Sequence, residues 1–416
     1  MLKCRINFKK AFCYLFVLFA VFATDSMITI SINVNTSFYY GMRIVALILC
    51  PVFLLLAVNI KALRKNFLCI TLLLGVSLIL TAVLNSDYAY IIMLKLVYFL
   101  LGYCAVKCFG ADNIVKAYVH IMLLITVWSL VCYVISLFSL APFAYFPEIT
   151  IVAAKSKIVS RFYNAFFAVL PQTSYDSIVR NYGMFAEPGI YQVYLLLAMM
   201  LVLYKKEFKH RTFSLGLFVL AMLTTFSTTG YIVTILLLFV YFVTNYEVKN
   251  WQKLVGFFIV VVAVGIIAQN EYLADLVFGK LKNKSNASTI SRLYSFVINF
   301  KIWLRNPAVG VGPVNVNALS DEIAYALTGS TFFHNTNTFM YTLGCYGIGV
   351  FGIEMWKAFR FSLYLDKSKM AALCLLVVMV LCLSGENLTH SLLIETVLFC
   401  GAVKPKEDAI KGGCRG

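Results

Sequence analysis

Charged residues are scarce in this sequence: they make up 13% of its 416 residues, against about 25% in an average soluble domain. Acidic residues are the rarest, with 18 Asp and Glu against 35 Lys and Arg. Proline and glycine, at 8 and 23 residues, are too infrequent for a collagen-like or low-complexity chain. What the sequence has instead is apolar side chains, at 62% of residues with a mean hydropathy of +0.87. These proportions exclude a soluble, disordered or fibrous protein and leave an integral membrane protein.

Apolar runs long enough to cross about 30 Å of hydrocarbon recur from one end of the chain to the other. We count about twelve such runs, which predict an all-α polytopic protein with a single membrane domain over residues 1–416. The predicted spans cover about residues 11–33, 41–60, 67–84, 88–106, 117–141, 187–204, 212–228, 230–245, 254–269, 337–356, 370–385 and 388–403. The first run is too long for a removable signal peptide, and no small-residue cleavage site follows it.

Basic residues are distributed unequally between the two sides that these spans define. Of the 35 Lys and Arg residues, 23 fall in the termini and in alternate loops, 11 fall in the other loops, and Lys95 lies inside a span. Because cytoplasmic loops carry the excess of positive charge, both termini are predicted to be cytoplasmic. Most of the formal net charge of +17 is then a topology signal, and no nucleic-acid partner is needed to explain it.

Two long segments on the outer side, about 142–186 and 270–336, hold ten of the eleven outer positive charges. Function concentrates in long loops on a rigid scaffold, so we expect it in these two large outer loops with interfacial helices. All twelve cysteines lie in spans or on the cytoplasmic side, and we therefore expect no disulfide in either loop. Cys104 and Cys108 are four residues apart without a further ligand beside them, which argues against a metal site.

The second outer segment contains a predicted amphipathic helix over Thr289–Arg305. Its apolar residues recur at helical spacing and fill one stripe, made of Ile290, Leu293, Phe296, Val297, Phe300, Trp303 and Leu304. Arg292, Ser295 and Asn299 follow the edge of this stripe. A helix of this kind lies in the membrane interface with its apolar side down, which puts Arg292 at headgroup depth. Arg292 then either anchors the helix by snorkelling or binds an anionic headgroup.

Two further motifs follow this helix. The glycine-rich sequence Asn306–Pro313 is either a plain turn or a phosphate cradle, and its Gly-Val-Gly alone favours the turn. His334 stands at the outer edge of the tenth span and is one of only 4 histidines. A lone interfacial histidine is either a hydrogen-bonded structural residue or, if it has partners, a functional group.

The first outer segment ends in Arg180 and, further on, in the sequence Glu187-Pro188-Gly189. Pro188 fits the first turn of the sixth span, so Glu187 stands at a helix N-terminus, where the helix dipole favours a carboxylate. Glu187 is there either a simple cap or part of a site. Arg180, Glu187, Arg292 and His334 are all predicted on the outer face at similar depth. Two arginines, a histidine and a carboxylate suit chemistry on an anionic lipid headgroup.

Three ionisable residues fall inside predicted spans: Asp25, Lys95 and Glu395. Each lies about 7–8 residues from the outer end of its span, which corresponds to roughly 10–12 Å. Unpaired charges at that depth are costly, so we expect Lys95 to pair with Asp25 or Glu395. The alternative is a cation-coupling site of a transporter.

Four segments of the sequence together resemble those of the O-antigen polymerases and O-antigen ligases, bacterial transferases of lipid-linked glycans. The segments are Arg180…Glu187-Pro188-Gly189, Ser227-Thr228-Thr229-Gly230, Arg292…Trp303…Asn306-Pro307-Ala308-Val309-Gly310-Val311-Gly312 and His334-Asn335…Leu343-Gly344…Gly347-Ile348-Gly349. The resemblance covers about residues 180–352. It implies a many-spanning fold with two large periplasmic loops, similar to membrane glycosyltransferases that use polyprenyl-linked donors.

By this resemblance, Arg180, Arg292 and Arg305 bind the donor diphosphate, His334 is the general base and Glu187 is the second choice for that role. The supporting residues that it implies are Asn335, Gly310, Gly312 and Tyr294. The Glu-Pro-Gly sequence favours a polymerase over a ligase. The implied enzyme joins undecaprenyl-diphosphate-linked repeat units at the periplasmic face of the inner membrane. It needs no metal or other cofactor, and its partners are membrane lipids and a chain-length regulator protein.

Two alternatives stay open. A ligase would use the same residues to transfer finished polymer to the lipid A core. A flippase or transporter of lipid-linked oligosaccharides would use the ionisable residues inside the spans. Against the transporter, the sequence has no repeated half and no pair of broken spans in corresponding positions.

Overall fold

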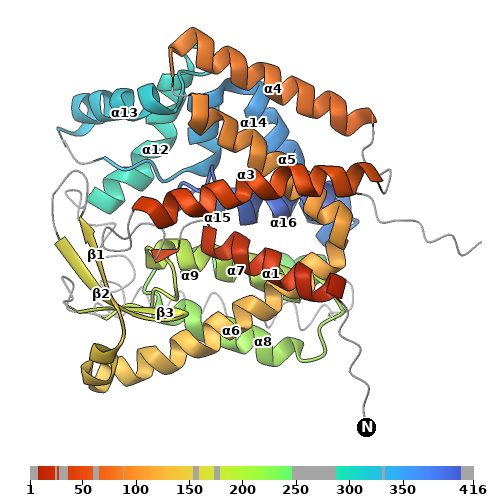
Figure 1. The fold of residues 1–416 in the computed structure, drawn as a ribbon. Coiled ribbons are helices and arrows are strands. Elements are labelled where there is room, and N and C mark those ends of the chain that lie inside the picture. Colours follow the sequence, from red (N-terminus) through yellow and green to blue (C-terminus); the bar gives the residue numbers. More distant parts are fainter. Residues whose placement is uncertain are drawn as a thin grey trace, which may run out of the picture.

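The computed structural model describes residues 8–23, 26–27, 36–59, 65–87, 89–152, 159–172, 179–245, 287–329 and 333–403. Most of these residues are helical (Figure 1). The helices are α1 (Phe8–Ala23), α3 (Thr36–Asn59), α4 (Lys65–Asn85), α5 (Ala89–Phe109), α6 (Ala111–Phe138), α7 (Pro188–Tyr204), α8 (Arg211–Thr224), α9 (Thr228–Thr244), α12 (Ala287–Trp303), α13 (Pro313–Thr328), α14 (Thr338–Leu365), α15 (Lys369–Leu383) and α16 (Leu392–Ala402). The predicted span at 254–269, Asp25 and both chain ends lie outside the described residues.

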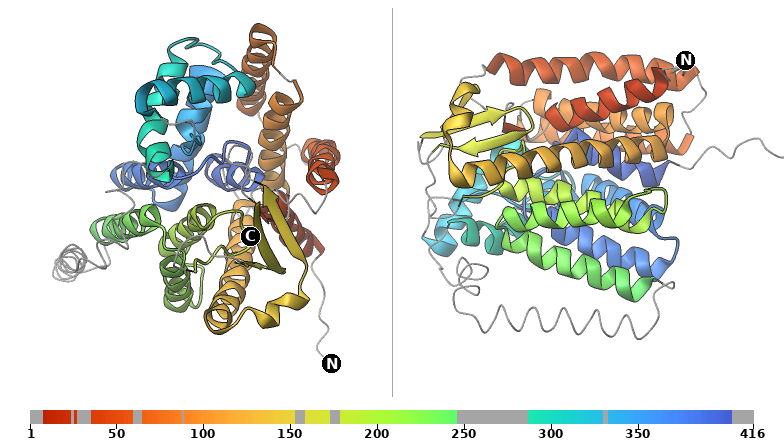
Figure 2. Two further views of the ribbon diagram at one scale, coloured as in Figure 1. Left: turned by 90° about the vertical axis from the view of Figure 1, so that its left-hand side faces the viewer. Right: turned by 90° about the horizontal axis from the view of Figure 1, so that it is seen from below.

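The helices lie side by side in one bundle, and most of them run close to a common axis (Figures 1 and 2). Four of them, α3, α4, α5 and α6, are long and apolar enough to cross a membrane. Five more, α7, α8, α9, α15 and α16, are apolar but only 10–17 residues long. The prediction of an all-α fold with helices that can span a membrane is confirmed. The count of twelve spans stays a prediction.

Helix α7 is the innermost element of the bundle. Nearly all of its residues are buried, which is the position expected for a helix that is apolar on every side. The apolar windows of α3 and α4 are only 22% buried, so these helices present most of their hydrophobic surface outward. Such surface is stable where hydrocarbon covers it. The core therefore centres on α7, and the peripheral helices α3 and α4 present an outer surface that suits a lipid environment.

The first predicted outer segment contains a small sheet where the sequence predicts interfacial helices. After a 3-10 helix (Ala141–Tyr145), three antiparallel strands follow in the order β1 (Glu148–Val152), β2 (Val159–Ala165) and β3 (Ala168–Pro171), with Glu148 opposite Tyr163 and Phe162 opposite Pro171. β-Branched and aromatic residues are frequent here and favour extended backbone. Trp128 Nε1 of α6 donates a hydrogen bond to the Ala165 carbonyl (2.7 Å), which holds the β2–β3 hairpin against α6. Helices occur in the second outer segment, as α12 and α13.

Helix α14 is interrupted at Gly347, whose φ is 73°. The glycine-rich turn Asn306–Gly312 docks on this break. Three backbone hydrogen bonds join the two, from Val311 N to Gly344 O (3.0 Å), from Gly312 N to Cys345 O (2.9 Å) and from Ile348 N to Pro307 O (3.1 Å). Because the turn uses its amide groups inside the protein, the structure favours a plain turn over a phosphate cradle.

Gly310 is the point of closest approach in this docking. Its φ is +69°, and a Cβ atom there would overlap the carbonyl of Cys345. We expect Gly310→Ala to lower the free energy of unfolding by about 2–4 kcal/mol, through backbone strain and steric overlap. Thermal unfolding of the full chain in detergent measures the loss. Gly352→Ala in α14 is the control, because nothing lies within 4 Å of its Cβ position. Equal melting temperatures for the two variants would contradict the docking.

Candidate functional site

Helix α12 forms where the sequence predicts a helix, and its faces differ as the sequence pattern indicates. Phe296 and Phe300 on the apolar side are 56% and 40% exposed. Ser291, Ser295 and Asn299 on the polar edge are buried. The apolar side of α12 is therefore available to lipid, and its polar edge faces the protein.

The polar edge of α12 binds the segment that carries His334. Three hydrogen bonds join the segment to α12, from His334 N to Ser291 Oγ (3.1 Å), from Thr336 N to Ser295 Oγ (3.2 Å) and from Asn299 Nδ2 to Asn335 Oδ1. A fourth, from Asn335 Nδ2 to Ser320 Oγ (2.9 Å), joins it to α13. Asn335 thus fixes this segment to α12 and α13. The backbone of His334 lies against Ser291, the residue before Arg292, and the His334 side chain is exposed.

Arg292 reaches from α12 to two other parts of the chain. Its Nη1 donates to Thr229 Oγ1 (3.0 Å) in the first turn of α9, and its Nη2 lies 3.7 Å from Glu386 Oε1. Its Nε is buried without a hydrogen-bond partner among the described residues. The guanidinium therefore keeps a donor for a further acceptor, and 29% of the side chain is exposed.

Arg180, in the segment that precedes α7, contacts the turn between α8 and α9. Its Nε donates to the Thr225 carbonyl (3.1 Å) and its Nη2 to the Phe226 carbonyl (2.7 Å). Thr225, Phe226 and the Thr229 partner of Arg292 fall within five consecutive positions. Two arginines that are far apart in the sequence therefore both contact the junction between α8 and α9. Arg180 binds the carbonyl groups at the end of α8, and Arg292 binds the first turn of α9.

The N-terminal end of α9 has no side-chain cap. Ser227 occupies the N-cap position, but its buried hydroxyl makes no hydrogen bond in the part of the chain that the structure describes. The first backbone N–H groups of a helix carry partial positive charge and favour anions. Together with Arg180 and Arg292 they form a positively charged site, which the Glu386 carboxylate balances in part.

Glycines let the elements of this site pack closely. A Cβ on Gly189 of α7 would overlap Glu386 Oε1, and a Cβ on Gly230 would overlap Gln192 Oε1. Gln192 is fully buried, and neither of its amide atoms has a hydrogen-bond partner among the described residues. An unsatisfied buried polar group costs about 1–3 kcal/mol, so the Gln192 amide indicates a position for a bound water or ligand atom.

Glu187 is the N-cap residue of α7, with Pro188 in the first turn, as the sequence predicts. Its side chain is exposed and makes no capping hydrogen bond. Because Gly189 packs against Glu386, the start of α7 lies beside the ion pair of Arg292. The segments that carry Arg180, Glu187, Arg292 and His334 are therefore in contact with one another or through one shared neighbour.

The structure does not bring four other predicted residues to this site, namely Arg305, Tyr294, Gly310 and Gly312. Arg305 lies about 20 Å along the helix axis from Arg292 and pairs with the exposed Glu322 (3.4 Å). Tyr294 is about 200° around α12 from Arg292, on a different face. The two glycines serve the docking of the turn on α14. The four residues were assigned to the site because they belong to the same sequence motif as Arg292. The rise of α12 separates Arg305 from Arg292, and its rotation separates Tyr294 from Arg292.

Glu386, Thr229 and Gln192 are site residues that the sequence analysis did not select as candidates. Thr229 lies in the Ser-Thr-Thr-Gly segment between two spans. Glu386 is the carboxylate in the short turn between the last two predicted spans, where an acidic residue is a detectable signal. Gln192 gives no such signal, because an uncharged glutamine in an apolar helix can simply hydrogen-bond to a neighbouring helix.

A second polar cluster, the charge quartet of Lys95, Glu354, Lys357 and Glu395, lies inside the bundle. Lys95 Nζ is 2.6 Å from Glu395 Oε1 and 2.8 Å from Glu354 Oε1, while Lys357 Nζ is 2.8 Å from Glu354 Oε2 and also pairs with Glu395. The predicted pairing of Lys95 with Glu395 is confirmed. The tenth predicted span ends at about residue 356, whereas α14 continues to Leu365 and buries Lys357 completely.

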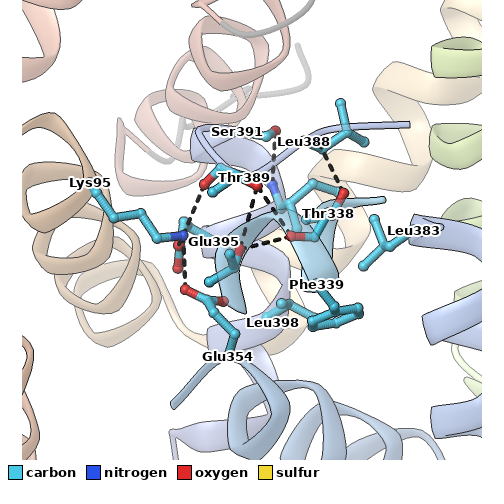
Figure 3. A pocket seen from close by; sticks show the side chains of 12 residues that line it. Lys95, Thr338, Phe339, Glu354, Leu383, Leu388, Thr389, Ser391, Glu395 and Leu398 are labelled. Carbon is cyan, nitrogen blue, oxygen red and sulfur yellow. Dashed lines mark hydrogen bonds and ion pairs between the residues drawn. The ribbon is translucent and has the colours of Figure 1, made fainter. Parts of the chain in front are cut away.

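The charge quartet also holds the loop between α15 and α16 (Figure 3). Lys95 Nζ donates to the Thr389 carbonyl (2.9 Å). Thr338 Oγ1, at the start of α14, donates to the Glu386 carbonyl (2.7 Å) and accepts from the Leu388 N–H (3.0 Å). A cavity of about 10 Å³ lies between these groups, which is space for about one water molecule. The loop that carries Glu386 is therefore fixed both by the charge quartet and by α14.

No family model, no curated protein and no solved structure matches this chain. Among the described residues, no three His, Cys, Asp or Glu side chains gather as they would around a metal ion. What the site binds is therefore inferred from its own residues.

Lys95→Met removes one cation from the charge quartet and leaves two buried carboxylates with Lys357 alone. We expect the free energy of unfolding to fall by about 3–5 kcal/mol. Adding Glu395→Gln to this variant restores neutrality and should recover part of the loss. Arg305→Met breaks an exposed ion pair, and as the control it should change the free energy of unfolding by less than about 1 kcal/mol. Thermal unfolding in detergent compares the three variants, and equal losses in K95M and R305M would refute the role of the quartet.

Proposed function

We propose that this chain is a polytopic membrane glycosyltransferase, an O-antigen polymerase that joins undecaprenyl-diphosphate-linked repeat units. One observation carries the proposal: Arg180 and Arg292, from two separate segments, both contact the junction between α8 and α9, Arg180 at the end of α8 and Arg292 in the first turn of α9. Two guanidinium groups beside a helix N-terminus favour an anion with several charged oxygens. The diphosphate of a polyprenyl-linked donor is such an anion.

The charges at the site leave capacity for a diphosphate. Arg180 bonds to carbonyl groups at the end of α8, whose partial negative charge offsets only part of the full charge of the guanidinium. Arg292 faces one carboxylate at 3.7 Å, and its buried Nε has no partner among the described residues. Arginine holds phosphate oxygens through two parallel N–H groups, which an ammonium group cannot do.

In the proposed reaction, a hydroxyl oxygen of the acceptor sugar forms a bond to the anomeric carbon of the donor glycan. The bond from that carbon to the diphosphate oxygen breaks, and undecaprenyl diphosphate leaves with the bonding electrons. The hydroxyl proton passes to a basic side chain. Arg180, Arg292 and the end of α9 stabilise the negative charge that develops on the leaving diphosphate, and such preorganised charge lowers the barrier.

His334 is the proposed general base, and Glu187 is the second candidate. The backbone of His334 is held beside Arg292, and its side chain is exposed. Glu187 is exposed at the start of α7. Both side chains are therefore accessible to a substrate bound at the arginines, and an imidazole exchanges protons readily near neutral pH.

The finer topology belongs to the same proposal: about twelve spans, both termini cytoplasmic, and a site that faces the periplasm of a bacterial inner membrane. The arrangement in Figure 1 supports it, since β1–β3, α12 and α13 gather at one end of the bundle and the N-terminal end of α1 lies at the other. The exposed apolar side of α12 at the first of these ends suits a polyprenyl chain that remains in the bilayer.

Arg292→Ala and Arg180→Ala should each slow chain extension by about 10²–10³-fold, because each removes one charge that stabilises the leaving group. The measurement is the gel ladder of surface polysaccharide from a strain that lacks the chain and carries each variant. Lys301→Ala is the matched control: it removes an exposed positive charge from the same helix, α12, and should leave the ladder complete. Complete ladders from both arginine variants, with normal protein levels, would rule out the site.

The strain that lacks the chain also separates the rival functions. Loss of a polymerase leaves lipid A core that carries a single repeat unit. Loss of a ligase leaves bare core and polymer that stays on undecaprenyl diphosphate. Loss of a flippase leaves single repeat units on their lipid carrier at the inner side of the membrane. Either of the last two results would overturn the polymerase proposal.

A further inference from the structure

A groove of about 650 Å³ lies between α6 and α8 and shares no residue with the candidate site. Its walls come from one face of α6, from the turn Glu207–His210 and from the first half of α8. A volume of this size is typical of sites for small molecules or parts of lipids. All of its lining residues belong to the described part of the chain.

Polar side chains gather at one end of this groove. Lys116 and His120 stand near the start of α6, and Lys209 and His210 stand directly before α8. Lys116 Nζ lies 2.5 Å from Glu207 Oε2, so the starts of the two helices meet at this end. The end of the groove where these residues lie is called its mouth below.

Further along both helices the groove becomes apolar. Leu124 and Val127 follow Lys116 on α6 by about 12–16 Å, and Phe213 lines the α8 side. These three side chains are 53%, 45% and 68% exposed. Apolar side chains exposed to this extent, in a helix that can span a membrane, need hydrocarbon over them. The groove thus has a polar mouth and an apolar floor, which is the arrangement of a lipid headgroup and its chains.

The mouth has an excess of positive charge. Lys116 and Lys209 line the groove with one carboxylate, that of Glu207, and the Asp112 carboxylate also interacts electrostatically with Lys116. Lys10 of α1 lies close enough to His120 to interact with it electrostatically. Both α6 and α8 begin here, and the positive end of a helix dipole adds to the field. His210, the N-cap residue of α8, makes no side-chain capping bond, so the first N–H groups of that helix are not capped by it.

We propose that this groove binds an anionic glycerophospholipid of the leaflet on the predicted cytoplasmic side. The phosphate lies at the mouth beside Lys116 and Lys209, and the acyl chains lie along Leu124, Val127 and Phe213. The excess of lysine over carboxylate at the mouth selects a headgroup with net negative charge over a zwitterionic one. The proposal does not depend on the glycosyltransferase activity, because the mouth lies at the start of α8, whereas Arg180 contacts the turn that follows the end of that helix.

Native mass spectrometry of the full chain in detergent tests this binding with two probes, dioleoyl phosphatidylglycerol and dioleoyl phosphatidylcholine. We expect tighter binding of phosphatidylglycerol. The double variant Lys116→Gln/Lys209→Gln should weaken that binding by roughly 5-fold for each lysine removed. Lys367→Gln/Lys369→Gln, which removes two exposed charges that do not line the groove, should retain it.

Leu124→Trp provides a second test that changes no charge. The indole fills the apolar floor, so this variant should lose bound phosphatidylglycerol while Lys116 and Lys209 remain in place. Thermal unfolding confirms that each variant is folded before its lipid binding is compared. Equal binding of the two lipids by the unaltered chain would overturn the proposal. So would equal loss in the two double variants, or full retention of phosphatidylglycerol by L124W.

Discussion

Charged side chains inside an apolar helix bundle are stable only when other buried charges neutralise them. The charge quartet meets this requirement with two lysines and two glutamates. Its members come from α5, α14 and α16, so these helices cannot separate without leaving charges unpaired. Lys95 also binds the Thr389 carbonyl, which places the loop that carries Glu386. The position of the carboxylate opposite Arg292 therefore depends on neutrality achieved elsewhere in the bundle.

At the candidate site, Arg292 has two kinds of neighbour, the hydroxyl of Thr229 and the carboxylate of Glu386. An anion that binds there competes with Glu386 for the guanidinium, so binding is an exchange of ionic partners. Arg180, whose neighbours are carbonyl groups, supplies charge that needs no exchange. In the proposed function the two arginines thus have different tasks: Arg180 would contribute to affinity throughout, and Arg292 would exchange its carboxylate partner for the anion.

Features that depend on one helix could be predicted from the sequence. The helix at α12 with its exposed apolar side and Pro188 in the first turn of α7 follow from local spacing. The pairing of Lys95 with Glu395 joins two helices, and it could be predicted because isolated charge in a membrane is costly. Glu354 was missed because its role depends on which helices become neighbours, and no local pattern encodes that choice. Glu386 stands out locally as an acidic residue between two spans, but its pairing with Arg292 depends on the same choice. Arg305 was assigned from its place in a motif, whereas helical geometry carries it away from Arg292.

The docking of the turn Asn306–Gly312 on the break at Gly347 has a mechanical consequence. The turn directly follows α12, whose apolar side is exposed. It is hydrogen-bonded to α14 at the point where that helix is interrupted. A displacement of α12 would therefore be carried through these hydrogen bonds to the middle of α14. Bending of the long helix at Gly347 would in turn shift the end of α12.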